Sequence, residues 1–254
     1  MTATTPLGLA ALFVVGALAA AINAVAGGGS LLSFPLLVGL GVPPLQANAT
    51  NSVGIWPGSL GSALGFRNLL PATAHHLRDL VLPTAAGAWF GAWLLVQTSE
   101  RLFRFAVPVL ILAATLLLAF QPQIRAWIFG RRRRVSPVLG AFLQFLVSVY
   151  GGYFGAGMGI MMLAVFALFI DGNIHELNAF KAWLGIVINL VASFELLLKG
   201  LVLPVPGAAL ALGAVCGGFA AARLSQRVDS EKLRKAIVVL GAGMVVWFTY
   251  QTFS

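Results

Sequence analysis

A glycine-rich break follows a long apolar segment at two places in this chain. The first break is Gly27-Gly28-Gly29-Ser30, after an apolar segment that starts near Pro6, and the second runs from Gly151 to Gly159, after a segment that starts near Pro137. Each break is followed by a short apolar segment and then by a segment that opens on polar residues. Helices broken at matching points of two halves are typical of the binding site of a membrane transporter.

Composition indicates a membrane protein. Of the 254 residues, 59% are hydrophobic and 9% are charged, whereas a soluble domain carries about 25% charged residues. Several apolar segments reach the roughly 20 residues that a membrane-spanning helix needs. The first of them has no positive charge before it and no clear cleavage site after it, so we expect a membrane helix there and not a secretory signal. The predicted fold is an all-α polytopic membrane protein.

The predicted helices follow the same order in both halves. We expect helices near residues 6–25, 30–40, 47–66, 79–97 and 103–121, and again near 137–154, 158–170, 177–199, 204–222 and 233–252. The chain would thus comprise a first transmembrane repeat over 1–121, a basic linker over 122–136 and a second transmembrane repeat over 137–254.

The two segments that directly follow the glycine breaks, 30–40 and 158–170, are short. About 11 helical residues cover only about 16 Å, roughly half of the hydrocarbon core of a bilayer. The sequence leaves open whether these segments are re-entrant half-helices or parts of a full span. Either reading gives the same sides for the loops.

Positive charges predict the orientation of the chain. Most of the 16 Lys and Arg residues fall in loops expected on one side, including Arg131 to Arg134 in the linker, whereas Arg101, Arg104 and Lys199 fall on the other. Because Lys and Arg mark cytoplasmic loops, we expect the linker in the cytoplasm and both termini outside. The two repeats would then be inverted, related by a pseudo-two-fold axis in the membrane plane. The net charge of +9 is read as this topology signal, and no nucleic-acid partner is expected.

The sequence around the breaks resembles a known family. The resemblance lies in residues 23–37 (NAVAGGGSLLSFPLL), 39–44 (GLGVPP) and 47–51 (ANATN), and more loosely in 178–181 (NAFK) and 189–192 (NLVA). In these stretches, and over nearly its whole length, the chain resembles the TauE/SafE family, also called TSUP, of sulfite exporter-like membrane permeases. The resemblance implies transport of small anions such as sulfite, sulfonates or sulfur-containing organic acids, without identifying the substrate.

The glycine breaks themselves are the first candidate binding site. Glycine lets the backbone approach a ligand closely, and the N–H groups and dipole at the start of the following helix attract an anion. We therefore expect substrate contacts at Gly27, Gly28, Gly29 and Ser30, and at Gly155 and Gly157. The alternative is that these glycines only permit close helix packing, as small residues do in membranes.

The segments that open on polar residues supply the other candidates. Asn48, Thr50 and Asn51 could donate hydrogen bonds to substrate oxygens, or could simply cap a helix near the interface. In the second half, Asn178 aligns with Asn48 and Lys181 with Asn51.

Lys181 is the sharpest single candidate, because an intramembrane charge is costly and commonly functional. The alternative is that its side chain snorkels to the interface. Asn189 would share the face of Lys181 and either reach substrate or bond a neighbouring helix. Glu195 is a candidate for proton coupling, although a surface ion pair with Lys199 at i+4 is the simpler account.

The sequence points to transport and not to catalysis. It contains no His-Glu-x-x-His motif and no Walker loop, and no His, Cys or acidic cluster suggests a metal, so we expect no enzyme, metal or cofactor. We expect a secondary transporter that moves a small anion by alternating access, multi-pass in the cytoplasmic membrane, in contact with membrane lipids. The alternative is a passive channel or a cation carrier of similar architecture, and homo-oligomerisation is left open.

Overall fold

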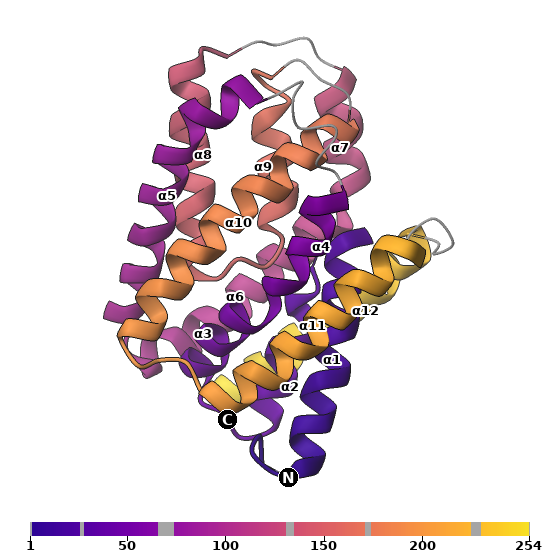
Figure 1. Cartoon of the computed structure of the whole chain (residues 1–254). Helices are drawn as coiled ribbons and strands as arrows, with labels where there is room; N and C mark the ends of the chain where they lie inside the picture. The colour runs from indigo at the N-terminus through magenta and orange to yellow at the C-terminus, as the bar shows by residue number, and fades with distance from the viewer. Residues whose placement is uncertain are drawn as a thin grey trace.

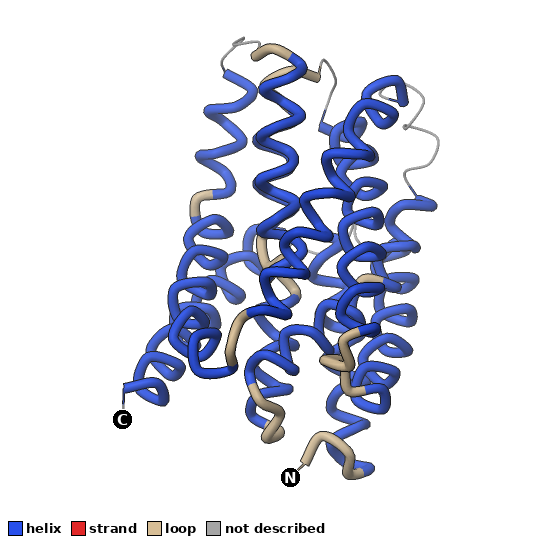
Figure 2. Tube along the Cα trace, turned by 90° about the vertical axis from the view of Figure 1, so that its left-hand side faces the viewer, coloured by secondary structure: helices blue, strands red, loops and turns tan. Residues whose placement is uncertain are grey.

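The structure, a computed structural model, describes residues 2–25, 28–65, 74–130, 135–170, 174–224 and 230–253. In these ranges the chain is helical, without strands (Figure 2). The helices are α1 (Pro6–Val25), α2 (Ser30–Gly39), α3 (Pro44–Ile55), α4 (Pro57–Gly65), α5 (Ala74–Gln97), α6 (Glu100–Ala119), α7 (Gln121–Gly130), α8 (Pro137–Tyr153), α9 (Met158–Phe166), α10 (Ile174–Leu198), α11 (Pro204–Leu224) and α12 (Ser230–Phe253). Among the described residues, 5 helices are long and apolar enough to cross a membrane. The prediction of an all-α polytopic membrane protein is confirmed.

Two helix predictions were wrong in ways that matter for the site. The helix expected over 47–66 is divided into α3 and α4 at Trp56, because Pro57 has no N–H to donate to the preceding turn. The linker expected as a basic loop over 122–136 begins as a helix, since α7 extends to Gly130. Pro122 lies in the first turn of α7, where its fixed φ suits a helix start.

Helices α2 and α9, which follow the two glycine breaks, are as short as the sequence predicted. They contain 10 and 9 residues, so each is about 15 Å long or less, about half of a bilayer core. The N–H of Val135, just before α8, donates to the carbonyl of Leu168, just after α9, at 3.0 Å. The chain therefore returns after α9 to the end at which α8 begins, so that α8 and α9 form a hairpin.

The two halves are packed crosswise. Helix α1 packs along α11, and α8 packs along α5, so the first helix of each half lies against the fourth predicted segment of the other. Helix α6 packs against α12. This exchange of partners is what inverted repeats would produce, although the repeat relation itself stays a prediction.

Glycine lets the crosswise pairs approach backbone to backbone. On α11, Gly213 and Gly217 are spaced so that both face α1, where an added Cβ would meet the carbonyl oxygens of Phe13 and Ala17. On α5, Gly87 and Gly91 have the same spacing, and an added Cβ would meet carbonyl oxygens of α8. Small residues four apart are the usual means of close helix association in membranes.

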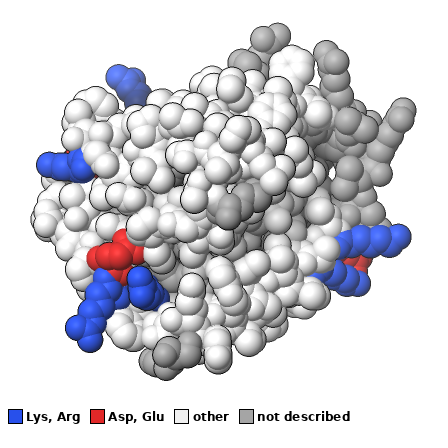
Figure 3. All heavy atoms as spheres, turned by 90° about the horizontal axis from the view of Figure 1, so that it is seen from below, with Lys and Arg blue, Asp and Glu red and all other residues white. Residues whose placement is uncertain are grey.

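Both termini lie at the same end of the molecule (Figure 1). Seen from that end, most of the surface is uncharged, and the Lys and Arg side chains stand in separate groups toward its edge (Figure 3). Helices α6 and α11 begin at this end, next to Arg101, Arg104 and Lys199. The arrangement places these three residues and the termini together, as the charge pattern predicted, whereas Arg131 to Arg134 lie outside the described residues.

Substitution of Gly217 by Ala tests the close approach of α1 and α11. The new Cβ would meet the backbone of Ala17, and overpacking of this kind costs about 1–3 kcal/mol. We expect the midpoint of thermal unfolding in detergent to fall by several degrees. Gly243→Ala in α12 is the matched control, because a Cβ there meets nothing within 4 Å. Equal midpoints for the two variants would show that the α1–α11 contact is not tight.

Candidate functional site

A cavity of about 250 Å³ lies where the two glycine breaks meet, and residues of both halves line it. Its walls come from α1, α2, α3, α4, α7, α8, α9 and α10. Eight of the residues predicted to bind substrate line it: Gly28, Ser30, Asn51, Gly155, Gly157, Asn178, Lys181 and Asn189. Gly27 lies outside the described residues.

The backbone of the first break is bonded by the side chain of Asn23, which the sequence did not indicate as a site residue. Gly28 has a φ of 85°, a conformation that glycine adopts without strain. Just after it, the N–H of Gly29 donates to Oδ1 of Asn23 at 2.7 Å. Asn23 lines the cavity, and the only signal for it in the sequence is an amide inside an otherwise apolar run. Gly29 itself does not line the cavity, because it lies against the backbone of Ala19 in α1.

The second break also depends on glycine and on one side chain. Gly155 and Gly157 each have a φ of 78°, and Gly157 is the N-cap of α9. The hydroxyl of Tyr150 donates to the carbonyl oxygen of Ala156 at 2.6 Å. Gly157, Met158 and Gly159 all line the cavity, so α9 begins at the cavity wall and its N-terminal dipole acts there.

Lys181 lies against the first turn of α9. A Cβ added to Gly159 would come within 3.3 Å of Cδ and 4.0 Å of Nζ of Lys181, so the absence of a side chain at Gly159 makes room for the lysine. The ammonium group donates to Oδ1 of Asn178 at 2.8 Å, one turn earlier in α10. The lysine is half-buried in the cavity wall, and its charge and the α9 dipole act on the same space.

The side-chain amides of Asn51 and Asn189 each form one hydrogen bond within the protein. Oδ1 of Asn51 accepts a hydrogen bond from the hydroxyl of Ser33 at 2.6 Å, which leaves its NH₂ group as a donor at the cavity. The NH₂ group of Asn189 donates to the carbonyl of Gly185 at 2.7 Å. Asn51 and Asn189 thus line the cavity and also form hydrogen bonds within the protein, which are the two alternatives that the sequence left open for Asn189.

Two predicted residues are turned away from the cavity and join elements instead. The NH₂ group of Asn48 donates to the carbonyl oxygen of Tyr153 at 2.8 Å, linking α3 to the end of α8. The hydroxyl of Thr50 accepts from the N–H of Leu203 at 2.9 Å, just before α11 begins. Both side chains are buried, and neither lines the cavity.

Glu195 is buried in α10, with 9% of its surface exposed, and lies outside the cavity lining. Its side chain forms no ion pair with that of Lys199, although the structure describes both residues. The surface ion pair is therefore wrong. The role of Glu195 in proton coupling stays a prediction.

Three further polar residues of the wall were not foreseen: Trp56, Ser59 and Gln121. Ser52, of the polar cluster that also contains Asn51, lines the cavity as well. Trp56 and Ser59 reach the cavity beside the break at Pro57, and Gln121 does so because α7 begins directly after α6. Of the described residues that line the cavity, Lys181 alone carries a charge, and none is a carboxylate. The arrangement can hold a group of single negative charge among neutral donors.

A cavity between broken helices of two apolar halves is typical of membrane transporters. The family model described as Sulfite exporter TauE/SafE matches residues 12–248. The chain belongs to this family, a family of transporters and not of enzymes, and the resemblance read from the glycine breaks is confirmed.

Relatives of the same length carry matching descriptions. The chain is similar to a "Probable membrane transporter protein" of Haemophilus influenzae, 29% identical over 246 residues, which cover 95% of this chain and 94% of that protein. It is also similar to "Probable membrane transporter protein YfcA" of Escherichia coli K12, 26% identical over 98% of this chain and 92% of that protein. A Sinorhizobium protein, "Probable membrane transporter protein ORF9", is 26% identical over 94% of this chain and 91% of that protein. No solved structure matches the chain.

Substitution of Gly159 by Val tests the room that this glycine leaves for Lys181. A branched side chain would occupy the position beside Cδ of the lysine and displace the ammonium group. Loss of a hydrogen bond to a charged group costs about 1.5–3 kcal/mol, so we expect sulfite to bind roughly tenfold or more weakly in calorimetric titration. Gly39→Ala, where a Cβ meets nothing within 4 Å, should bind as the unmodified protein does. Unchanged sulfite affinity in Gly159→Val would show that Lys181 does not contact the bound anion.

Proposed function

We propose that the protein is a secondary transporter that moves a small anion, such as sulfite, a sulfonate or a related sulfur-containing organic anion, across the cytoplasmic membrane by alternating access. One observation carries the proposal. The ammonium group of Lys181 lies beside the N-terminus of α9 in a cavity that both halves line. The family description, which names a sulfite exporter, supports the same substrate class.

The charge of the wall favours an anion over a cation. A cation site inside a membrane needs carboxylates or converging carbonyl groups, and the described lining has no carboxylate. The side-chain carbonyls of Asn51 and Asn178 already accept hydrogen bonds from Ser33 and Lys181. The donors that remain, together with the lysine charge, favour an oxyanion.

The orientation follows from the charge pattern of the sequence. Both termini lie at one end of the molecule, and the end of α7 and the start of α8, which flank residues 131–134 in the sequence, lie at the opposite end (Figure 1). Since Lys and Arg accumulate on the cytoplasmic side, both termini would face outward. The crosswise packing of α1 with α11 and of α8 with α5 supports the inverted relation of residues 1–121 and 137–254.

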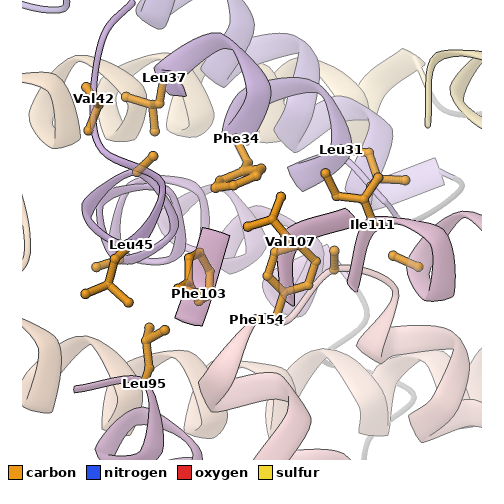
Figure 4. Packing of buried hydrophobic residues seen from close by; sticks show 14 of the residues in the cluster. Leu31, Phe34, Leu37, Val42, Leu45, Leu95, Phe103, Val107, Ile111 and Phe154 are labelled. Carbon is orange, nitrogen blue, oxygen red and sulfur yellow. The ribbon is translucent and has the colours of Figure 1, made fainter. Parts of the chain in front are cut away.

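Aromatic side chains pack together beside the cavity wall. The ring of Phe154, which lines the cavity, packs edge-on against Phe34 with centroids 5.9 Å apart. Phe34 stacks on Phe248 at 5.6 Å. Figure 4 shows Phe34, Phe154 and Phe103 together in this cluster, among side chains of α2, α3 and α6.

The aromatic cluster favours a carrier over a passive channel. A channel would need a continuous polar lining, whereas the cavity wall at Phe154 borders a cluster of buried rings. The hydrogen bond from Asn48 to Tyr153 joins the two halves at the same level. In alternating access, movement of one half against the other would break this bond and separate Phe34 from Phe154, and it would be driven by the substrate gradient or by protons.

Replacement of Lys181 by Ala tests the anion site in transport. We expect Lys181→Ala in proteoliposomes to abolish uptake of labelled sulfite, because the site loses its one charge. Lys181→Arg keeps the charge and should retain partial uptake. Lys199→Ala is the control, since Lys199 is exposed at the end that holds the termini.

Each variant is checked for folding by gel filtration and thermal unfolding. Uptake at the unmodified rate by folded Lys181→Ala would remove the lysine from the mechanism.

A further inference from the structure

We infer that Ser33 is a positioning residue, which makes the side chain of Asn51 a hydrogen-bond donor to the bound anion. The inference rests on the proposed function and deepens it, because it concerns how one group of the anion site is oriented. It depends on a hydrogen bond between α2 and α3 and on the other partners of the atoms that form this bond.

The side-chain amide of Asn51 has two ends that differ in what they can do. One end is a carbonyl oxygen, which accepts hydrogen bonds, and the other is an NH₂ group, which donates them. One end of the amide meets Ser33, and because Asn51 lines the cavity, the other end is available to a ligand. In one orientation the cavity gains an N–H donor for an anion, and in the other it gains an oxygen that repels one.

The length of the bond to Ser33 decides between the two orientations. Oγ of Ser33 lies 2.6 Å from Oδ1 of Asn51. This distance is typical of an O–H···O bond and is shorter than the range of about 2.7–3.2 Å for N–H···O bonds. A hydroxyl that donates to the side-chain carbonyl accounts for the distance, whereas an NH₂ group that donates to the hydroxyl does not.

The Ser33 hydroxyl has one proton and a second acceptor within reach, the carbonyl oxygen of Gly29 at 3.3 Å. That oxygen already accepts the backbone N–H of Leu32 at 3.0 Å and that of Ser33 at 3.3 Å. Oδ1 of Asn51 is closer to the hydroxyl, and Ser33 is its one donor among the described residues. Because a buried acceptor without a donor is costly, the proton belongs to the bond with Asn51.

The NH₂ group of Asn51 remains for the ligand, since it donates to no other group in the described part of the chain. Ser33 is fully buried and does not line the cavity, so the contact with a ligand would be made by Asn51. The second half orients its polar residue differently, because Lys181 is bonded by Asn178 of its own helix. In the first half, the orienting group comes from the short helix that follows the break.

The test is a double-mutant cycle, in which sulfite affinity is measured by calorimetric titration of the full chain in lipid nanodiscs. A neutral hydrogen bond shifts an equilibrium about fivefold, and a bond to a charged group shifts it about tenfold or more. We therefore expect the Kd for sulfite to rise about fivefold in Ser33→Ala and about tenfold or more in Asn51→Ala. In the double variant, Kd should lie within about twofold of that in Asn51→Ala, because Ser33 acts through the amide.

Two further variants separate orientation of the amide from packing of α2. Ser33→Thr keeps the hydroxyl, and its Kd should lie within about twofold of that of the unmodified protein. Ser193→Ala removes a buried hydroxyl that has no hydrogen-bond partner among the described residues, and it should leave sulfite affinity unchanged. Thermal unfolding without ligand verifies that each variant folds, and if Ser33→Thr does not, the double-mutant cycle decides.

The outcomes separate the inference from the proposed function. If Ser33→Ala weakens sulfite binding equally with Asn51 present and in Asn51→Ala, Ser33 acts through the packing of α2 and the inference is wrong. If sulfite binds in a Lys181-dependent way and Ser33→Ala leaves its Kd unchanged, the inference is wrong and the anion site stands. If the unmodified protein does not bind sulfite, both the anion site and the inference are wrong.

Discussion

Close contact between helix backbones of opposite halves is the constraint on which this structure depends. Lipid tails are as apolar as leucine, so helices in a membrane gain from van der Waals contact and not from leaving water. Glycines of α11 and α5 bring these helices onto the carbonyl groups of α1 and α8. Because α1 and α8 are each fixed to the opposite half, the breaks that follow them meet at one cavity. The cavity is thus a result of the packing between the halves.

Polar contacts then decide which groups remain available to a ligand. Helix α3 is bonded to the second half at two points within one turn, from Asn48 to Tyr153 and from Thr50 to Leu203. These bonds fix the rotation of α3, and Asn51 is the residue that then faces the cavity. The same helix therefore connects the halves through two of its faces and lines the cavity with another.

The sequence predicted the two breaks, the short helices that follow them and a place for Lys181 beside them. A glycine run inside an apolar segment interrupts a helix, and an intramembrane charge commonly faces the protein interior. The sequence could not choose among Asn48, Thr50 and Asn51, since successive helical residues point about 100° apart and the direction of the cavity depends on distant packing. Trp56 and Gln121 were missed for another reason. They reach the cavity only because α4 restarts at Pro57 and α7 follows α6 without a loop.

The two breaks use opposite kinds of hydrogen bond. At the first, Asn23 takes up an N–H group of the backbone, and at the second, Tyr150 takes up a carbonyl oxygen, in each case with a partner six residues further along the chain. The first break loses a donor and the second loses an acceptor. However alike the two halves are in outline, the cavity between them is electrically polar, with its positive pole at α9. A ligand bound there has one direction, so reversal of access by the protein would not require reversal of the ligand.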